Sequence, residues 1–152
     1  MSSNNLTQVR DYINSRIRIS EPSFNEWLGS LDDIGNIPST VIDNSYIIEL
    51  GSTTSTEQID QHIQEDQTVI ITIFKRGFNS PTEARDSLMQ TANCIRLDII
   101  KPLNVDAYKQ ANDGNIDKVV SVGLTPSEID ATNDNTIKVD IELSVALLIK
   151  SS

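Results

Sequence analysis

Hydrophobic and polar residues alternate through the C-terminal part of the chain. Every second residue from Ile137 to Ile149 is apolar, and the positions between them are polar at the start. This period of two predicts a strand over residues 137–149 with one face against a core. The second face becomes apolar at Ala146 and Leu148, which indicates that the strand enters a contact there.

A second apolar run is followed by a clear helix start. Residues 69–74 (VIITIF) are β-branched or aromatic and predict a largely buried strand. Ser80 is placed to cap a helix, Pro81 fits its first position, and Glu83 can reach back to the cap. Pro102 ends this helix, because the residue before a proline avoids the α region. The apolar stripe that would face the sheet is Ala84, Leu88, Ala92, Ile95 and Ile99.

The N-terminal region contains two further helical patterns. Apolar residues at helical spacing predict a helix over residues 5–18. A shorter helical segment is expected after Pro22, ending at Gly29. We expect its single tryptophan, Trp27, to plug the space between the first helix and the sheet.

Two more strands are predicted, over residues 45–52 and 116–124. Polar segments without sustained periodicity separate the predicted elements, and long connections of this kind often bind partners. The expected connections are residues 30–44, 53–67, 103–117 and 125–135.

Together these elements predict an α+β fold in a single domain over residues 1–152. The expected architecture is a four-stranded, mostly antiparallel sheet. The N-terminal helix and one long helix, about residues 81–100, would pack on one face of that sheet.

Composition narrows the function classes. The 12 basic and 22 acidic residues give a net charge of −10, which argues against a protein that grips nucleic acid by neutralising phosphates. An acidic wall along which DNA slides remains compatible with this charge. The single cysteine, Cys94, excludes an internal disulfide and a cysteine-based metal site, and we expect it to be half-buried and inert. No apolar run approaches the roughly 20 residues of a membrane span, so we expect a soluble protein made inside the cell.

No motif for catalysis or for a cofactor is present in the sequence. His62 could bind a metal with Glu65 or Asp66, but carboxylates on a polar segment are usually solvated. The basic pair Lys75-Arg76 could contact a phosphate, although a solvated turn explains it better. We therefore predict that the protein is not an enzyme and uses no cofactor.

Two groups of charged residues have simple explanations. The acidic positions around Asp113-Gly114 and in the 125–135 connection could suggest a calcium site, but they lack the ligand spacing of an EF-hand. Arg10, Arg16 and Arg18 make the N-terminal segment basic, which suits either self-association or a solvated helix face.

Three segments resemble the tail terminator (tail completion) proteins of tailed bacteriophages. They are residues 46–51 (YIIELG), residues 68–77 (TVIITIFKRG) leading into 80–85 (SPTEAR), and the hairpin 119–123 (VVSVG) with 136–143 (TIKVDIEL). The resemblance covers about residues 45–149 and is carried by the order of elements, with no chemical signature. Neither the Trp27 segment nor residues 125–135 match the family.

The resemblance implies a structural protein of the virion, assembled in the host cytoplasm. In that family the subunits form a hexameric ring that caps the tail tube and meets the neck connector, and in contractile tails also the sheath. DNA would pass through the lumen without specific binding, and no catalytic residues are implied. The polar connections would then face partners, and the candidate interface residues are Thr53, Glu57, Asp60, Glu65, Asp66, Asp106, Tyr108, Asp113, Glu128, Asp130 and Asp134.

Two other functions remain open from the sequence. One is a head-completion or stopper protein of the same neck, a class that tends toward all-β folds. The other is a small intracellular binding module whose sheet edge accepts a strand from a partner.

Overall fold

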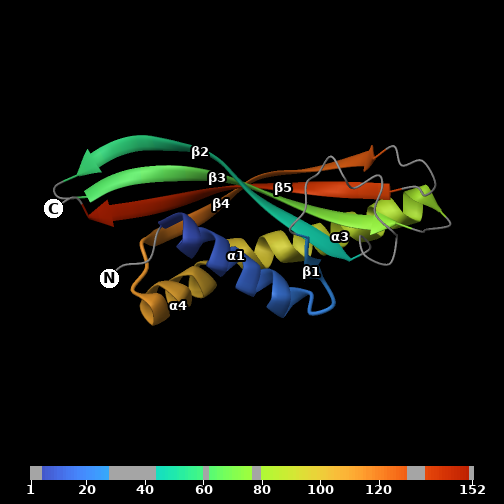
Figure 1. The fold of residues 1–152 in the computed structure, drawn as a ribbon, viewed down its shortest axis with the longest axis horizontal. Coiled ribbons are helices and arrows are strands. Elements are labelled where there is room, and N and C mark those ends of the chain that lie inside the picture. Colours follow the sequence, from blue (N-terminus) through green and yellow to red (C-terminus); the bar gives the residue numbers. More distant parts are fainter. Residues whose placement is uncertain (1–4, 28–43, 60–61, 77–79, 130–135, 151–152) are drawn as a thin grey trace.

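The computed structural model describes residues 5–27, 44–59, 62–76, 80–129 and 136–150. This part of the chain forms an α+β fold in which three helices cover one face of a twisted, five-stranded sheet (Figure 1). The helices are α1 (Asn5–Ser20), α3 (Pro81–Ile100) and α4 (Pro102–Asn112), and the strands are β1 (Asn25–Glu26), β2 (Ser45–Ile59), β3 (His62–Arg76), β4 (Ile116–Ile129) and β5 (Thr136–Lys150).

The strand order in the sheet is β1-β2-β3-β5-β4. Neighbouring strands are antiparallel except β1, which runs parallel to β2 and pairs only with Ser45 and Tyr46. Among the described strands, none lies along the outer side of β2 beyond Tyr46, and none lies along the outer side of β4. Within the described residues, the sheet therefore has two long free edges.

The long strand and the long helix predicted from the sequence are both confirmed. Every odd-numbered residue of β5 from Ile137 to Leu147 is buried, and Ile149 packs against the same core. In α3 the Ser80 hydroxyl accepts a hydrogen bond from the backbone N–H of Glu83 at 3.4 Å, and Pro81 occupies the first turn. The whole predicted apolar stripe of α3 is buried against the sheet.

The core also fixes α1, whose buried side chains include Val9, Tyr12, Ile13 and Ile17. The predicted N-terminal helix is thus confirmed, with two more residues at its C-terminal end. Cys94 is exposed, so the expectation of a half-buried thiol is wrong. Its position lies outside the buried stripe of α3.

The predicted sheet of four strands is wrong by one strand. Residues near Trp27 form β1, where a second helix was expected. The backbone N–H of Asn25 donates to the carbonyl of Asn44 at 3.0 Å, and that of Trp27 donates to Tyr46 at 2.7 Å. A segment this short gains more from pairing with β2 than from an isolated helical turn, because helix nucleation is costly. The connection expected at residues 30–44 lies outside the described residues, apart from Asn44.

The polar segment 53–67 is also not a connection. It forms the outer part of a hairpin, with β2 extending to Ile59 and β3 starting at His62. Polarity alone suggested a loop, but threonine and serine in a ladder pair well when both faces of the sheet meet water. Two register shifts in this hairpin, after Leu50 and after Ser55, bend β2.

The segment 103–117 contains the third helix, α4, and is also not a connection. Pro102 does end α3, but it is at the same time the first residue of α4, a position that proline favours. Val105 is the buried side chain of α4 and marks its inner face. The connection expected over residues 125–135 is wrong up to Ile129, where β4 ends, and residues 130–135 lie outside the described residues.

Candidate partner interface

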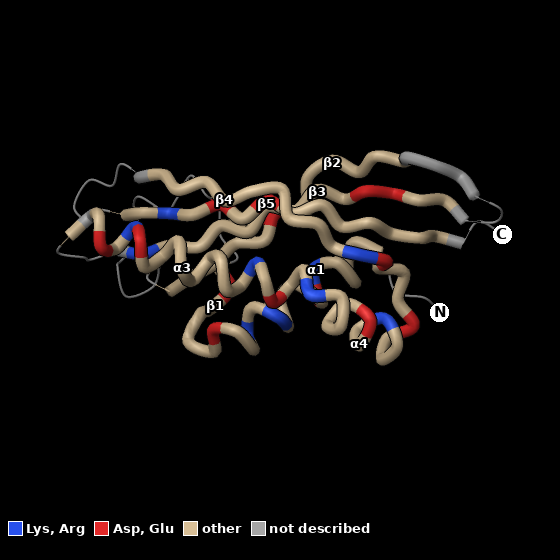
Figure 2. The backbone as a smooth tube through the Cα atoms, turned by 180° about the vertical axis from the view of Figure 1, so that it is seen from behind, with Lys and Arg blue, Asp and Glu red and all other residues tan. Residues whose placement is uncertain are grey.

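The face of the sheet opposite the helices, which we call the outer face, carries most of the charged strand residues. In β3 and β5 it is formed by the even-numbered positions, since the odd-numbered positions face the helices. Glu49, Ile70 and Glu142 share one row across this face. Figure 2 shows acidic residues along β3 and β5, while the basic residues of α1 lie in the helix layer. The outer face is therefore more acidic than the helix side around α1.

One carboxylate of the outer face is fixed in place. The Thr72 hydroxyl donates to Asp140 Oδ1 at 2.7 Å, and the Lys138 ammonium lies 3.3 Å from Asp140 Oδ2. Glu49 on the neighbouring row is exposed and belongs to the free edge of β2. The outer face thus has both a held and a solvent-exposed acid.

One end of the sheet projects beyond the helices, as Figure 1 shows at the tips of β2 and β5. We call this end the arm; it consists of residues 51–59 of β2, 62–67 of β3 and 146–150 of β5. Residues 51–55 of β2 are all exposed. The arm is built mainly from polar side chains on strands, so its surface is fixed by backbone pairing.

Gln67 closes the base of the arm. Its side chain is fully buried, and its amide nitrogen donates to the carbonyl oxygens of Gly51 at 2.8 Å and of Thr68 at 2.9 Å. The Thr53 hydroxyl donates to the amide oxygen of Gln67. These bonds satisfy the backbone at the bulge that follows Leu50, where the regular ladder is interrupted.

A second group of polar residues lies where α4 meets α1. Tyr12 and Tyr108 make an edge-to-face contact with ring centroids 5.3 Å apart. The Tyr12 hydroxyl donates to the carbonyl of Ile99 at 2.5 Å, and burial raises the pKa of Tyr12 above its ordinary range. Asp106 and Asp113 line a shallow hollow of about 410 Å³ together with Lys109 and Gln110 of α4. At this corner the ring contact is structural, and the acidic groups are on the surface.

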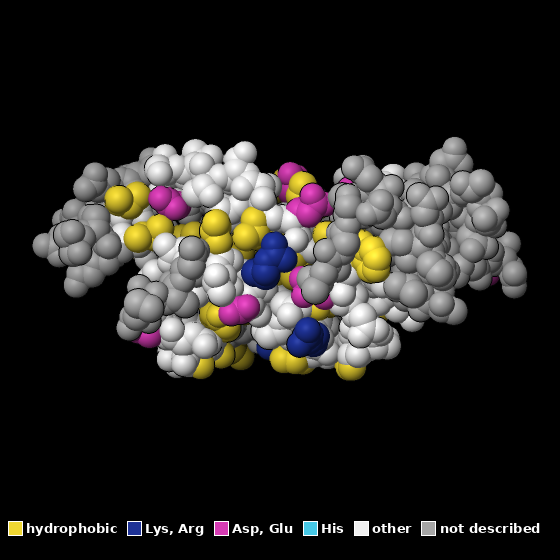
Figure 3. Space-filling view, in the orientation of Figure 1, with side chains coloured by type: hydrophobic (Ala, Val, Ile, Leu, Met, Phe, Trp, Pro, Cys, Tyr) yellow, Lys and Arg dark blue, Asp and Glu magenta, His cyan; other side chains and the backbone are white. Residues whose placement is uncertain are grey.

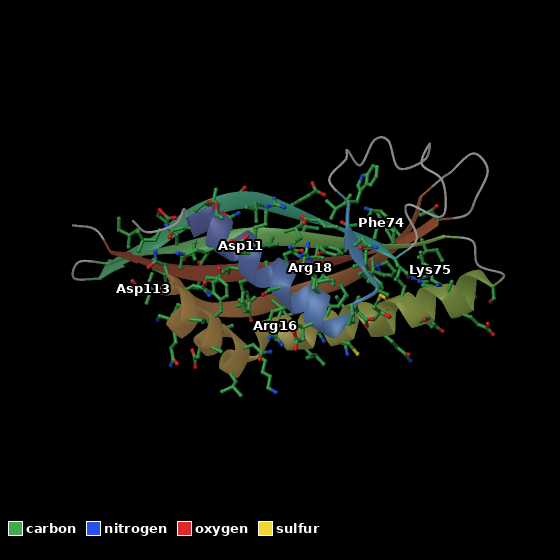
Figure 4. The ribbon with its side chains drawn as sticks, turned by 60° about the horizontal axis from the view of Figure 1, so that its bottom comes forward. Asp11, Arg16, Arg18, Phe74, Lys75 and Asp113 are labelled. Atoms are coloured by element: carbon green, nitrogen blue, oxygen red, sulfur yellow. The ribbon has the colours of Figure 1, made fainter. Side chains whose placement is uncertain are left out.

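The basic residues of α1 are engaged within the chain. Arg16 forms a bidentate pair with Asp98 of α3, with both N–O distances at 2.8 Å, and this hydrogen bond raises the pKa of Arg16. Arg10 lies 3.4 Å from Glu26 of β1. Figure 3 shows basic side chains over α1, and Figure 4 places Arg16 and Arg18 along that helix. For Arg10 and Arg16, intramolecular pairing explains the basic segment without self-association.

The predicted interface residues fall into three groups. Thr53, Glu65 and Asp66 lie in the arm, and Asp106, Tyr108 and Asp113 lie on or directly after α4. Glu57 and Glu128 are placed only as backbone positions of β2 and β4, and Asp60, Asp130 and Asp134 lie outside the described residues. The structure therefore brings the described candidates into two separate places.

The chemical alternatives considered from the sequence rest partly on His62 and Arg76, whose side chains lie outside the described part of the structure. The described residues contain no group of three or more histidine, cysteine, aspartate or glutamate side chains that could hold a metal ion. His62 is placed in β3 by its backbone alone. Lys75 is half-buried near one end of the molecule, opposite Asp113 (Figure 4). None of the described helices is both long and apolar enough to cross a membrane.

Sequence reasoning missed Gln67 and Tyr12 as organising residues. A glutamine in a polar segment gives no signal of burial, and the phenol of Tyr12 bonds a carbonyl 87 residues away. Two buried polar atoms in the described chain, Trp27 Nε1 and Arg96 Nε, have no hydrogen-bond partner. The local sequence around Trp27 and Arg96 does not predict that these nitrogen atoms are buried.

Comparison with known proteins adds no relative to this picture. No protein-family model matches the chain, and no curated protein matches it.

Proposed function

We propose that the protein is a structural component of a phage tail, acting as a tail terminator. Subunits would form a ring, hexameric by the resemblance, that caps the tail tube and joins it to the neck connector. In a contractile tail the ring would also contact the sheath. The mechanism is geometric: identical subunits close head-to-tail contacts, and the finished ring blocks further addition to the tube.

The arm is the observation that supports this proposal most. It extends three strands beyond the helix layer, it is rich in exposed polar side chains, and Gln67 stabilises its base. Ordering such strands costs conformational entropy, and the arm contributes few side chains to the core. A rigid, polar projection of this kind suits a docking contact with another protein. Glu65 and Asp66 give that contact an acidic character.

The acidic outer face supports a role around DNA. Surfaces of like charge repel a polyanion, so an acidic lumen lets DNA pass without holding it. Glu49, Asp66 and Glu142 supply negative charge to this face, and the chain as a whole carries −10. In the proposed ring the part of the outer face around Glu49 would line the channel, since its positions Thr72 and Phe74 are buried within the subunit. The virion tail would be the site of the protein.

Two measurements test the proposal. Light scattering after size exclusion, with negative-stain images, should find a ring with a central hole; added to growing tail tubes, the protein should stop elongation. The double variant Glu65→Ala/Asp66→Ala should cap tubes less well than a matched pair, Glu83→Ala/Asp86→Ala, on exposed positions of α3. A protein that stays monomeric and leaves tube length unchanged would overturn the proposal.

The binding-module alternative has one observation in its favour, namely the two free strand edges. Such an edge can accept an extended peptide from a partner. A stable monomer that captures a peptide along β2 or β4 would favour it. The stopper alternative is less well supported, because that class tends toward all-β folds and this chain contains three described helices.

A further inference from the structure

The two free edges of the sheet belong to strands that run in opposite directions. β2 is antiparallel to β3, β3 to β5, and β5 to β4, so β2 and β4 are antiparallel to each other. A second copy placed beside the first in the same orientation brings its β2 next to β4. The resulting pairing is antiparallel, which is the more stable arrangement of strands.

The two edges are also similar in length. β4 has 14 residues, and β2 has 15, of which only the first two pair with β1. A ring built by one repeated rotation needs two different surfaces that fit each other, whereas pairing of β4 with a second β4 would close a dimer. These edges are two such surfaces on opposite sides of one sheet.

The β4 edge is unusually apolar for a strand that meets water. Val120 is 47% exposed and Val122 is 58% exposed. Natural edge strands are commonly protected by charges, prolines or bulges, and β4 has register shifts after Ile116 and after Ser121. Val122 lies within the second shift and Val120 just before it, with the uncharged Ser121 between them, so this part of the edge carries no charge of its own.

The two edges carry opposite charges on the same face of the sheet. Lys118 of β4 is exposed and lies on the outer face, opposite Ala146. Glu49 of β2 is exposed and lies on the outer face, opposite Ile70. In an antiparallel pair, placing Lys118 opposite Glu49 also places Val120 opposite Ile47, because the numbers run in opposite directions along the two strands. An ionic cross-strand pair then forms, and Val120 lies beside Ile47, whose side chain is only 7% exposed within its own subunit.

We infer that the β4 edge of one subunit pairs with the β2 edge of a second copy, so that one sheet continues from subunit to subunit. Lys118 meets Glu49 of the neighbouring copy, and Val120 meets its Ile47. This inference rests on the proposed ring and names the contact that closes it.

Charge reversal tests the contact without disturbing the core, because Lys118 and Glu49 are both exposed. Lys118→Glu alone and Glu49→Lys alone should each place like charges opposite one another and raise the assembly concentration on the order of tenfold at low salt. Mixed one to one, the two variants should assemble as well as the natural protein, because every interface of an alternating ring then pairs opposite charges. Arg85→Glu and Asp86→Lys, exposed on α3, are the matched controls and should assemble normally.

The outcomes separate this inference from the ring itself. If the natural protein forms rings and both single variants form them equally well, the strand contact is wrong while the ring stands. Variants that fail alone and also fail when mixed overturn the strand contact in the same way. A natural protein that is monomeric at every concentration and on tail tubes overturns both.

Discussion

The two halves of the β2–β3 hairpin are held together by different means. In the inner half, Ile48 and Ile71 are buried neighbours beneath the helices. In the arm, the two strands stay antiparallel through two register shifts and carry mostly polar residues. Among the described side chains of this half of the hairpin, Gln67 is the fully buried one. The inner half is stabilised by apolar burial, and the arm by its ladder and one buried hydrogen-bond group. Strands can therefore extend well beyond the hydrophobic core when hydrogen bonds, here those of Gln67, hold the junction between the inner half and the arm.

Removing apolar volume from the inner half should have the largest effect. Ile71→Ala deletes a side chain with no exposed surface at the centre of β3, and we expect the free energy of unfolding to fall by about 2–5 kcal/mol. Urea denaturation measures it. Thr54→Ala in the arm is the control, and we expect a change within about 0.5 kcal/mol because Thr54 is exposed. Equal losses in the two variants would contradict the contrast between the halves.

The junction should be next in sensitivity. Gln67→Met keeps the length of the side chain but leaves the Gly51 carbonyl without its amide donor, and we expect a loss of about 1–3 kcal/mol. Hydrogen exchange should show faster exchange in the arm than in the inner half of the same strands. If the arm kept its protection in this variant, the ladder alone would be sufficient to hold it.

Tyr12 links the helices over the inner half and gives a pH dependence. Tyr12→Phe leaves the carbonyl of Ile99 without its phenol donor and should cost about 1–2 kcal/mol. Burial raises the pKa of Tyr12, so above about pH 10 the unfolded chain releases a proton that the folded chain retains. Stability is therefore full below that pH and falls as the pH rises further.

Denaturation at pH 8 and at pH 11 tests the sign. The natural protein should lose stability between the two, and Tyr12→Phe should lose less because one titrating phenol is gone. Burial also raises the pKa of Tyr46 and of Tyr108, so part of the alkaline loss should remain. An identical loss in the variant would contradict the role given to Tyr12.

The smallest effect is expected at the start of α3. Ser80→Ala removes a cap whose hydrogen bond is long, at 3.4 Å, and exposed, so we expect a loss of about 0.5 kcal/mol, at the low end for such caps. Thermal unfolding measures it. Ser87→Ala makes the same change at an exposed position inside the helix and should cost nothing. A larger loss at Ser87 than at Ser80 would show that the cap is not in use.

The sequence was sufficient where periodicity and burial agree. The alternation in β5 and the stripe of α3 identified both elements, because each buries one face against the same core. The arm escaped this reasoning, since strands wet on both faces have no hydrophobic period. Likewise, α4 was missed because Pro102 signals an end and a beginning alike. Of the candidate interface, sequence alone could point to polar segments but could not show that Glu65 lies on a strand of the sheet and Asp106 on a helix of the other layer.

Lys101 is the only residue between α3 and α4. It ends one helix and begins the other, with φ −61° and ψ 120°, and the Asn104 amide donates across the joint to the carbonyl of Asp98 at 2.7 Å. A linker of one residue leaves the two helices no freedom to move apart. The two helices therefore keep a fixed angle to each other over the twisted sheet, and a force on one helix is transmitted directly to the other.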